Sequence, residues 1–208
     1  MIHKHLLRQI AILVVSSAPA LGADLFVDPR DGHEYPTVAI GSLVWMAANL
    51  AHPTPNSWCF DDQPDDCESN GRLYSWAAAV KACPTGWRLA TDDDWVDLET
   101  ALGMDPAQAF TEGPRGTNEG TRLQVGGRRG FNAPICGYRR PDGGYARRGE
   151  RAAFWTASEH NEEDAWHRDI RSSVGTVYRS PVTKTYALSI RCVREVRRAQ
   201  GYLYRRFL

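Results

Sequence analysis

The clearest alternation of apolar and polar positions lies near the start of the chain, in TVAIGSLVW at 37–45. β-Branched residues alternate on both sides of a Gly-Ser pair, a pattern typical of a β-hairpin. Further along, the segment LYSWAAAVKAC at 73–83 is rich in alanine and repeats its large apolar residues at helical spacing. Pro84 and Gly86 end that pattern. We therefore expect a hairpin over 37–45 and a helix over 73–83.

A second helix is expected from Thr91 onwards, in TDDDWVDLETAL. Thr91 and Asp94 have the spacing of a capping box, and three early acidic residues suit the positive N-terminus of a helix. Trp95, Leu98 and Leu102 fall on one face of that helix. These three side chains are predicted to face the core.

The remaining segments predict loops and strands. Residues 51–70 are rich in Pro, Asp, Asn and Ser, which indicates a loop, and the Gly- and Arg-rich stretch up to Gly130 indicates long loops with at most short elements. Strand-like runs fill the C-terminal third of the chain, at 131–139, 151–159, 164–172, 174–180 and 185–196. Strands that gather after two helices predict an α+β fold rather than βαβ repeats.

The first 22 residues have the layout of a secretory signal peptide. Lys4 and Arg8 precede a short apolar stretch, which small residues follow. The layout fits cleavage after Ala20, Gly22 or Ala23. An uncleaved anchor is the alternative, but the apolar stretch is shorter than the roughly 20 residues that a spanning helix needs. We expect an exported protein, periplasmic, at the cell surface or extracellular, with no transmembrane segment after cleavage.

One domain is expected over 24–198, followed by a basic aromatic tail at 199–208. The chain has 25 Lys and Arg residues against 25 Asp and Glu residues, so its formal net charge is zero. This balance gives no electrostatic reason to expect a nucleic-acid partner. The 7 Trp and 8 Tyr residues can bury large areas, which argues against disorder.

The chain has 5 cysteines, and export permits disulfides between them. Cys59 and Cys67 flank a short polar loop and are expected to pair if that loop is ordered. A bond between Cys83 and Cys192 would close a loop of about 110 residues and stabilise the fold by roughly 4–5 kcal/mol on the chain-entropy model. Spacing alone does not settle this pairing. Cys136 is then left over, either as a small buried residue or as a reactive thiol.

Several motifs together resemble one known family. In order, they are DPRDGHEYPTVAIGSLVWMAANL, GRLYSWAAAVKACPTGWRLATDDDW, FWTASE and LSIRCVREV. They resemble the Fibrobacter succinogenes major paralogous domain, from about Asp28 to Val196. The resemblance implies an exported, disulfide-bonded protein with a C-type lectin-like fold, in which two helices pack on antiparallel sheets with long loops. It also implies the Cys83–Cys192 bridge from the first helix to the last strand. Ala90 departs from the family, which usually has Pro there.

Two acidic clusters are candidates for a calcium site. The first consists of Asp61, Asp62, Asp65, Asp66 and Glu68, and the second of Glu159, Glu162, Glu163 and Asp164. Carboxylate oxygens are calcium ligands, but the first cluster lacks the EF-hand spacing and is more typical of a solvated loop. The second lies where C-type lectin-like folds carry ligand loops, yet the Glu-Pro-Asn and Trp-Asn-Asp motifs of calcium-dependent sugar binders are absent. The metal is therefore left open.

The candidate ligand-binding residues are Trp58, Trp155, Glu159 and Trp166. Trp rings can stack on a sugar, but Trp155 and Trp166 have the spacing of core residues, so Trp58 in its polar loop is the best candidate for exposure. His33, His52, His160 and His167 show no metal-ligand spacing. The Gly- and Arg-rich stretch 126–130 is either an anion site or a mobile basic loop. The sequence contains no P-loop and no G-x-S-x-G motif.

Two functions of different classes fit these features. The first is a binding module whose loops, at about 104–150 and 157–165, recognise a glycan or an envelope protein. The second is an enzyme similar to the formylglycine-generating enzymes, which elaborate a related fold and use paired cysteines to bind copper. Because two bridges leave only Cys136, that pair is missing, and we expect no enzyme. A structural protein of the cell envelope is a further alternative to the binding module.

Overall fold

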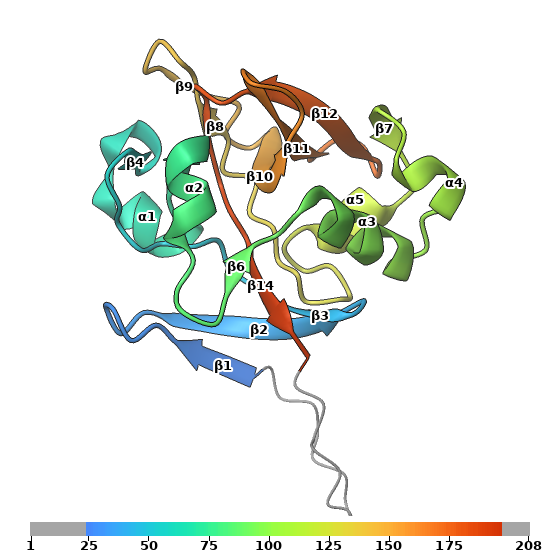
Figure 1. Cartoon of the computed structure of the whole chain (residues 1–208), viewed down its shortest axis with the longest axis horizontal. Coiled ribbons are helices and arrows are strands. Elements are labelled where there is room, and N and C mark those ends of the chain that lie inside the picture. Colours follow the sequence, from blue (N-terminus) through green and yellow to red (C-terminus); the bar gives the residue numbers. More distant parts are fainter. Residues whose placement is uncertain (1–23, 197–208) are drawn as a thin grey trace, which may run out of the picture.

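The computed structural model describes residues 24–196, which form three antiparallel sheets, five short α-helices and a 3-10 turn (Figure 1). The predicted signal peptide at 1–22 and tail at 199–208 lie outside the described residues. The α+β prediction is confirmed at the level of mixed helices and antiparallel sheets, although there are more helices than the two expected. None of the helices in the described part is long and apolar enough to cross a bilayer.

The predicted hairpin is present and forms the centre of the first sheet. Its strands are β2 (Glu34–Ile40) and β3 (Leu43–Met46). The sheet order is β1-β2-β3-β14-β6, where the other strands are β1 (Asp24–Val27), β14 (Cys192–Glu195) and β6 (Arg88–Leu89). Pairing of β14 with β3 therefore brings the two ends of the described chain to one sheet, at the bottom of Figure 1.

The hairpin turn needs its glycine for two reasons. Gly41 has a φ of 64°, which glycine adopts without strain. A Cβ there would also lie 2.4 Å from Asp97 Oδ2. That carboxylate oxygen accepts hydrogen bonds from the backbone N and the Oγ of Ser42, at 2.8 and 2.9 Å. The close approach fastens the turn to the helix that contains Asp97.

The second sheet is a meander of long strands. It consists of β10 (Arg151–Glu159), β11 (Asp164–Arg171), β12 (Val177–Thr183) and β7 (Gly113–Arg115), in that order. The strand predictions at 151–159 and 164–172 are thus confirmed, whereas the strand predicted at 174–180 begins three residues later, at Val177, and continues to Thr183. The prediction of a strand over 131–139 is wrong except at its end. Asn132 has a φ of 52° and Pro134 cannot donate a ladder hydrogen bond, so that segment runs as a loop.

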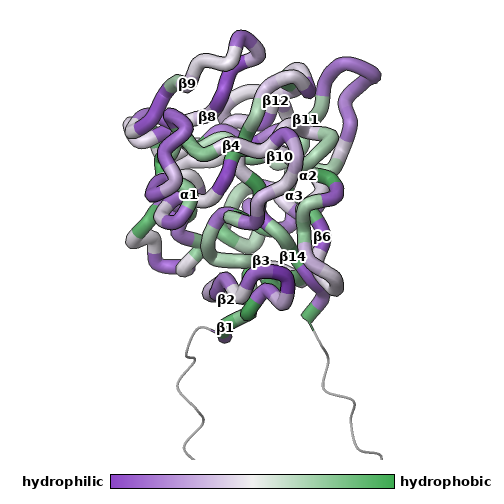
Figure 2. The backbone as a smooth tube through the Cα atoms, turned by 90° about the vertical axis from the view of Figure 1, so that its left-hand side faces the viewer, coloured by the Kyte–Doolittle hydropathy of each residue, from purple (hydrophilic) through white to green (hydrophobic). Residues whose placement is uncertain are grey.

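The third sheet is built from very short strands. Its order is β4 (Ser57–Trp58), β5 (Leu73–Ser75), β13 (Ala187–Leu188), β8 (Tyr138–Arg139) and β9 (Tyr145–Ala146). The predicted strand at 185–196 is therefore divided between β13 here and β14 in the first sheet. Figure 2 shows hydrophilic residues along the outer turns of this part, including the turn between β8 and β9.

Both predicted helices form, and one starts later than expected. Residues 73–75 are the strand β5, and α2 (Trp76–Ala82) begins after Ser75, whose Oγ accepts a hydrogen bond from the N of Ala78. The other helix is α3 (Asp92–Ala101), and it has the predicted capping box between Thr91 and Asp94. A side-chain acceptor at each first turn explains where both helices begin.

The predicted loops contain further short elements. The segment 51–70 is not a simple loop, because it includes the 3-10 turn η1 (Phe60–Asp62) and α1 (Pro64–Asn70). Pro64 occupies the first turn of α1 and Asp65 and Asp66 follow it, which favours a helix N-terminus. As expected, the stretch up to Gly130 has only short elements, α4 (Pro106–Ala109), β7 and α5 (Glu119–Leu123).

Both disulfides are present. Cys59 pairs with Cys67 and Cys83 pairs with Cys192, with Cα–Cα distances of 5.0 and 5.8 Å. The second bond joins the end of α2 to the last strand, as the resemblance implied. Cys136 is the free cysteine and is buried. Burial raises the pKa of its thiol, so the structure favours the small buried residue over the reactive thiol.

Helix α3 is held between the first and second sheets by aromatic and charged contacts. Trp95 packs edge-on against Trp45 and Phe131, with ring centroids 5.3 and 5.5 Å apart. On the side of the second sheet, Arg168 Nε donates to Glu99 Oε1 at 2.7 Å, and Arg168 Nη1 donates to Asp92 Oδ1 at 2.5 Å. These contacts fix the orientation of the long-stranded sheet.

Two further arginines complete this buried ionic cluster. Arg179 Nη2 donates to Asp92 Oδ2 at 2.8 Å, and Arg115 Nη1 donates to Glu99 Oε2 at 2.7 Å. Burial by itself raises the pKa of the Asp92 carboxyl, but the hydrogen bonds and charges of Arg179 and Arg168 outweigh it and hold that pKa below its usual value. The Asp92 carboxylate is therefore charged and held in place.

Candidate functional site

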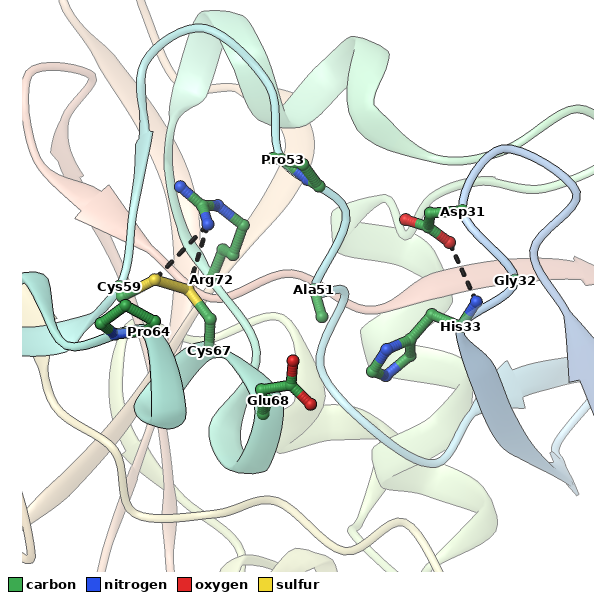
Figure 3. Close-up of a pocket in the computed structure, with 10 residues that line it drawn as sticks. All are labelled: Asp31, Gly32, His33, Ala51, Pro53, Cys59, Pro64, Cys67, Glu68 and Arg72. Carbon is green, nitrogen blue, oxygen red and sulfur yellow. Dashed lines mark hydrogen bonds between the residues drawn. A yellow bond between two sulfur atoms is a disulfide. The ribbon is translucent and has the colours of Figure 1, made fainter.

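A surface hollow of about 420 Å³ lies between the β1–β2 turn and the first disulfide (Figure 3). Its walls come from three places: the turn after β1, the segment after β3, and the disulfide loop with α1. The lining residues are Asp31, Gly32, His33, Ala51, Pro53, Cys59, Pro64, Cys67, Glu68 and Arg72. Carboxylate, imidazole and guanidinium groups thus face one opening.

Arg72 is fixed in the wall of this hollow. Its Nε donates to Ser57 Oγ and its Nη2 to the carbonyl of Ser57, both at 2.9 Å. Its Nη1 lies 3.4 and 3.2 Å from the sulfur atoms of Cys59 and Cys67, as the dashed lines in Figure 3 show. Because the guanidinium nitrogens of Arg72 already contact Ser57 and the disulfide, this side chain holds the disulfide loop in position and has little capacity to bind a ligand.

The β1–β2 turn forms the opposite wall through a group of ionisable side chains. Asp31 accepts a hydrogen bond from the backbone N of His33 at 3.0 Å, and its other oxygen lies 2.5 Å from His52 Nδ1. Asp28 is buried below the turn and is held by Arg30 Nη2 at 2.6 Å. Burial by itself raises the pKa of Asp28, but the hydrogen bonds and charge of Arg30 outweigh it and lower that pKa.

These same residues are the closest approach to a metal-binding group in the described part. Ligand atoms of Asp28, Asp31 and His52 all lie within 4.8 Å of one another, and within residues 24–196 no other His, Cys, Asp and Glu side chains form such a group. Arg30 already donates to both oxygens of Asp28. The group is therefore better described as an ion-pair cluster. Neither predicted acidic cluster brings three ligand atoms together.

A second hollow adjoins the first one, and a third adjoins the second at Val125. The second hollow, of about 370 Å³, shares His33, Ala51 and Glu68 with the first and reaches Val125. The third hollow, of about 490 Å³, also includes Val125 and is lined by the Gly- and Arg-rich segment up to Arg128. We call these three hollows the groove. Val125 is 69 % exposed, so the groove combines an apolar side chain with the exposed carboxylate of Glu68.

The structure places the predicted Trp residues outside the groove. Trp155 is fully buried, and its Nε1 donates to the carbonyl of Tyr74 at 2.8 Å. It therefore belongs to the core, which corrects its place among the ligand-binding candidates. Trp58 is half-buried, and the guanidinium of Arg139 lies 4.3 Å from its ring centroid. That cation stacks where a sugar ring was expected.

Trp166 and Glu159 lie near the β10–β11 turn. Arg179 covers one face of the Trp166 ring at 3.6 Å, and the ring of His160 packs edge-on, with centroids 4.7 Å apart. Glu159 is exposed and pairs with Lys184 Nζ at 3.3 Å. The same ammonium group also donates to the carbonyls of Asn161 and Glu162. The second acidic cluster is thus a turn held by a lysine, and the four candidates are not brought together.

Some groove residues were named from the sequence, among them Glu68 and the Gly- and Arg-rich stretch 126–130, but no sequence pattern placed them on one surface. His33 and His52 carried no ligand spacing, because their neighbours come from segments that are distant in the chain. The Asp31–His52 contact spans 21 residues, and Glu68 and Val125 line one hollow from segments that lie still further apart. The polar composition of 51–70 was one signal for this surface, since it marked a loop able to carry ionisable groups, and the Gly- and Arg-rich stretch 126–130 was another.

Comparison with models of known protein families gave one match. A family model described as Fibrobacter succinogenes major domain matches residues 38–194. The match lies within the domain expected from the sequence and covers the hairpin, both helices, both disulfides and the second sheet. Neither the curated proteins nor the solved structures contain a match to this chain.

Proposed function

The chain belongs to the Fibrobacter succinogenes major domain family, and from this premise we propose that it is an exported binding module that recognises a glycan or an envelope protein. The groove is the observation that carries the proposal. It extends from the first disulfide to the Gly- and Arg-rich loop within the predicted loop region 104–150. An extended surface with both polar and apolar lining residues suits a chain-like ligand.

Export is supported by the disulfides. Two bonds among five cysteines are typical of proteins that fold in oxidising compartments. The Cys59–Cys67 bond also borders the groove, and Arg72 packs on it. An oxidising compartment would therefore preserve the Cys59–Cys67 bond and, with it, the conformation of this wall of the groove.

A C-type lectin-like scaffold is part of this proposal. Its support is the bond between the end of α2 and the last strand, together with two helices packed on antiparallel sheets. In such a scaffold the core supports long loops, and the loops carry recognition. The groove is lined mainly by loops rather than by strands, as expected for a scaffold whose loops carry recognition.

We propose binding without catalysis. Cys136 is buried, and its Sγ lies 3.4 Å from the Oγ of Ser189 inside the core. A lone buried thiol with a raised pKa does not supply the paired cysteines that the copper chemistry of formylglycine-generating enzymes uses. The alternative enzyme function is therefore less well supported than recognition.

A binding screen on the oxidised protein tests the function. Glycan arrays and cell-envelope fractions are probed in calcium and again in chelator, which also tests whether binding requires calcium. For any ligand found, Glu68→Gln and Val125→Asp are each expected to raise the Kd at least about fivefold.

Leu25→Asp is the matched control, because Leu25 is an exposed apolar residue, 55 % exposed, on β1 outside the groove. This variant should bind as the unchanged protein does. Equal affinities for Glu68→Gln, Val125→Asp and Leu25→Asp would show that the groove is not the recognition surface. A complete absence of binding would favour the structural alternative.

A further inference from the structure

A second cavity, separate from the groove, lies on the long-stranded sheet. It measures about 210 Å³ and opens between β10–β12 and the short strands β8 and β13, near the top of Figure 1. Its lining residues are Tyr138, Arg151, Ala153, His167, Asp169, Arg171, Ser180, Val182, Tyr186 and Leu188. None of them lines the groove, so the two surfaces can be tested independently.

Strand alternation explains why polar groups converge there. Along β11, His167, Asp169 and Arg171 are two residues apart and share one face, while Arg168 and Ile170 point to the core behind. The residue opposite Asp169 on β10 is Ala153. Its small side chain leaves room for the cavity in front of the charged row.

His167 presents an acceptor in this cavity. One ring nitrogen, Nδ1, lies 2.7 Å from the carbonyl oxygen of Ser180 and must donate to it. Burial lowers the pKa of His167, so the ring is neutral at neutral pH. With the hydrogen on Nδ1, the other nitrogen, Nε2, is left as a hydrogen-bond acceptor.

Asp169 is only partly satisfied. Its Oδ2 accepts from Arg151 Nη1 at 3.1 Å and from Arg171 Nε at 3.4 Å. Its Oδ1 is buried and has no hydrogen-bond partner among the described residues. Because a buried acceptor without a donor is unfavourable, a ligand hydroxyl that reaches this oxygen would gain a bond that the protein alone lacks.

The two arginines supply the charge. The guanidinium of Arg171 stacks on the ring of Tyr178, 3.5 Å from its centroid, which holds its plane in position. Its two terminal nitrogens donate to no acceptor within residues 24–196, and the side chains of Arg151 and Arg171 are 31 % and 28 % exposed. Two guanidinium groups face one carboxylate and a neutral imidazole, so the cavity carries an excess positive charge.

We propose that this cavity binds a small hydroxylated carboxylate, the chemical class of the sugar acids. The ligand carboxylate pairs with the forks of Arg151 and Arg171, which suit planar oxyanions. Its hydroxyl groups donate to Asp169 Oδ1 and His167 Nε2. The rings of Tyr138 and Tyr186, which pack edge-on at 5.8 Å, contact its apolar face.

Calorimetric titration of the oxidised full chain with D-galacturonate tests the proposal, with D-galactose and acetate as comparison probes. Galacturonate is expected to bind at least about tenfold more tightly than either, because only it carries both the carboxylate and the hydroxyls. Equal affinity for galactose and galacturonate, or no galacturonate binding at millimolar concentration, would overturn the assignment.

Arg171→Ala is expected to weaken galacturonate binding at least about tenfold. Arg140→Ala is the matched control, since Arg140 is exposed on the β8–β9 turn and does not line the cavity. Thermal melting of both variants establishes that they fold. A folded Arg171→Ala protein that binds galacturonate unchanged would contradict the proposal, and so would equal losses in the two variants.

Asp169→Asn separates the hydroxyl contact from the carboxylate contact. It should reduce the preference for galacturonate over simple acetate, because the amide oxygen stays with the two arginines and the amide NH2, which is a donor, takes the place of the acceptor Oδ1. An unchanged preference would contradict the role of Oδ1. Trigalacturonate then distinguishes the sources: tighter binding than the monomer indicates the end of an acidic polysaccharide, and weaker binding indicates a free sugar acid.

Discussion

Both faces of the β10–β12 sheet carry arginines paired with carboxylates, but the two faces differ in how buried and how fully hydrogen-bonded these arginines are. On the face toward α3, Arg168 and Arg179 are bound to Asp92 and Glu99 and are almost completely buried. On the opposite face, Arg151 and Arg171 share one oxygen of Asp169 and are partly exposed. Arginines from neighbouring strands thus form a closed cluster with the carboxylates of α3 on one side and an open one with Asp169 on the other.

The comparison shows that charge alone does not mark a binding site. Arg168 uses three nitrogens on Asp92 and Glu99, so it has little to offer a ligand. Arg171 uses only Nε on Asp169 and borders a cavity. The remaining hydrogen-bonding capacity, together with space in front of it, distinguishes a candidate site from a structural ion cluster.

The largest expected effect comes from Glu99→Gln on the closed face. Glu99 accepts from both Arg115 and Arg168, and neutralising it leaves buried guanidinium charge without compensation. We expect a loss of about 3–5 kcal/mol in the free energy of unfolding, measured in urea. Glu163→Gln, at an exposed turn position, should change it by less than about 0.5 kcal/mol. A similar small change in both variants would refute the structural role of the cluster.

Low pH should destabilise the ionic cluster between α3 and the second sheet, because it protonates Asp92. Since its pKa is lowered in the folded state, its contribution is complete above the unfolded pKa, near pH 4, and is lost as pH falls through the folded pKa. Asp92→Asn should therefore flatten the dependence of unfolding free energy on pH below about 4. Urea unfolding at several pH values between neutral and strongly acidic measures this. An unchanged slope would mean that Asp92 is not the titrating group.

On the open face, Asp169→Asn should cost much less than Glu99→Gln. Its arginine partners are partly exposed and can turn toward water, so we expect a change of about 1 kcal/mol or less. The same urea titration gives both values side by side. A cost equal to that of Glu99→Gln would show that the two faces are equally structural.

The smallest expected effect is the contribution of His167 to the pH dependence of stability. The burial of His167 predicts ring titration below the usual value of 6.5, which ¹H–¹⁵N NMR of the imidazole would measure. Because the folded pKa is lowered, the contribution to stability is complete above about pH 6.5 and decreases as pH falls below it. His167→Gln should remove this weak slope. Titration at or above 6.5 would contradict the buried neutral ring.

Local patterns predicted those elements whose cause lies within a few residues. The hairpin at 37–45 follows from alternation around a Gly-Ser turn, and α3 begins at Thr91 because its capping partner is only three residues away. Patterns failed where packing decided. Leu73 to Ser75 have helical spacing, yet they pair as a strand with β13, more than 100 residues further along the chain. The strand expected at 131–139 is mostly a buried loop.

The candidate sites were less predictable than the fold. Trp155 and Trp166 were named for their chemistry, but the core buries one and Arg179 covers the other. His167 and Asp169 were not singled out as a pair. Their common face follows from alternation, whereas the cavity depends on Ala153 across the ladder and on Tyr186 from a separate segment. Such contacts join residues without any fixed spacing.

The sequence by itself determined the family, the mixed architecture, both main helices and the cysteines available for pairing. These depend on local periodicity, capping and ordered motifs, which act over a few residues. Only the tertiary structure decided which arginines are closed in ion pairs and which face a cavity. The reason is physical: hydrogen-bonding capacity is consumed by partners that folding brings together, so a side chain is free or occupied only after the chain has packed.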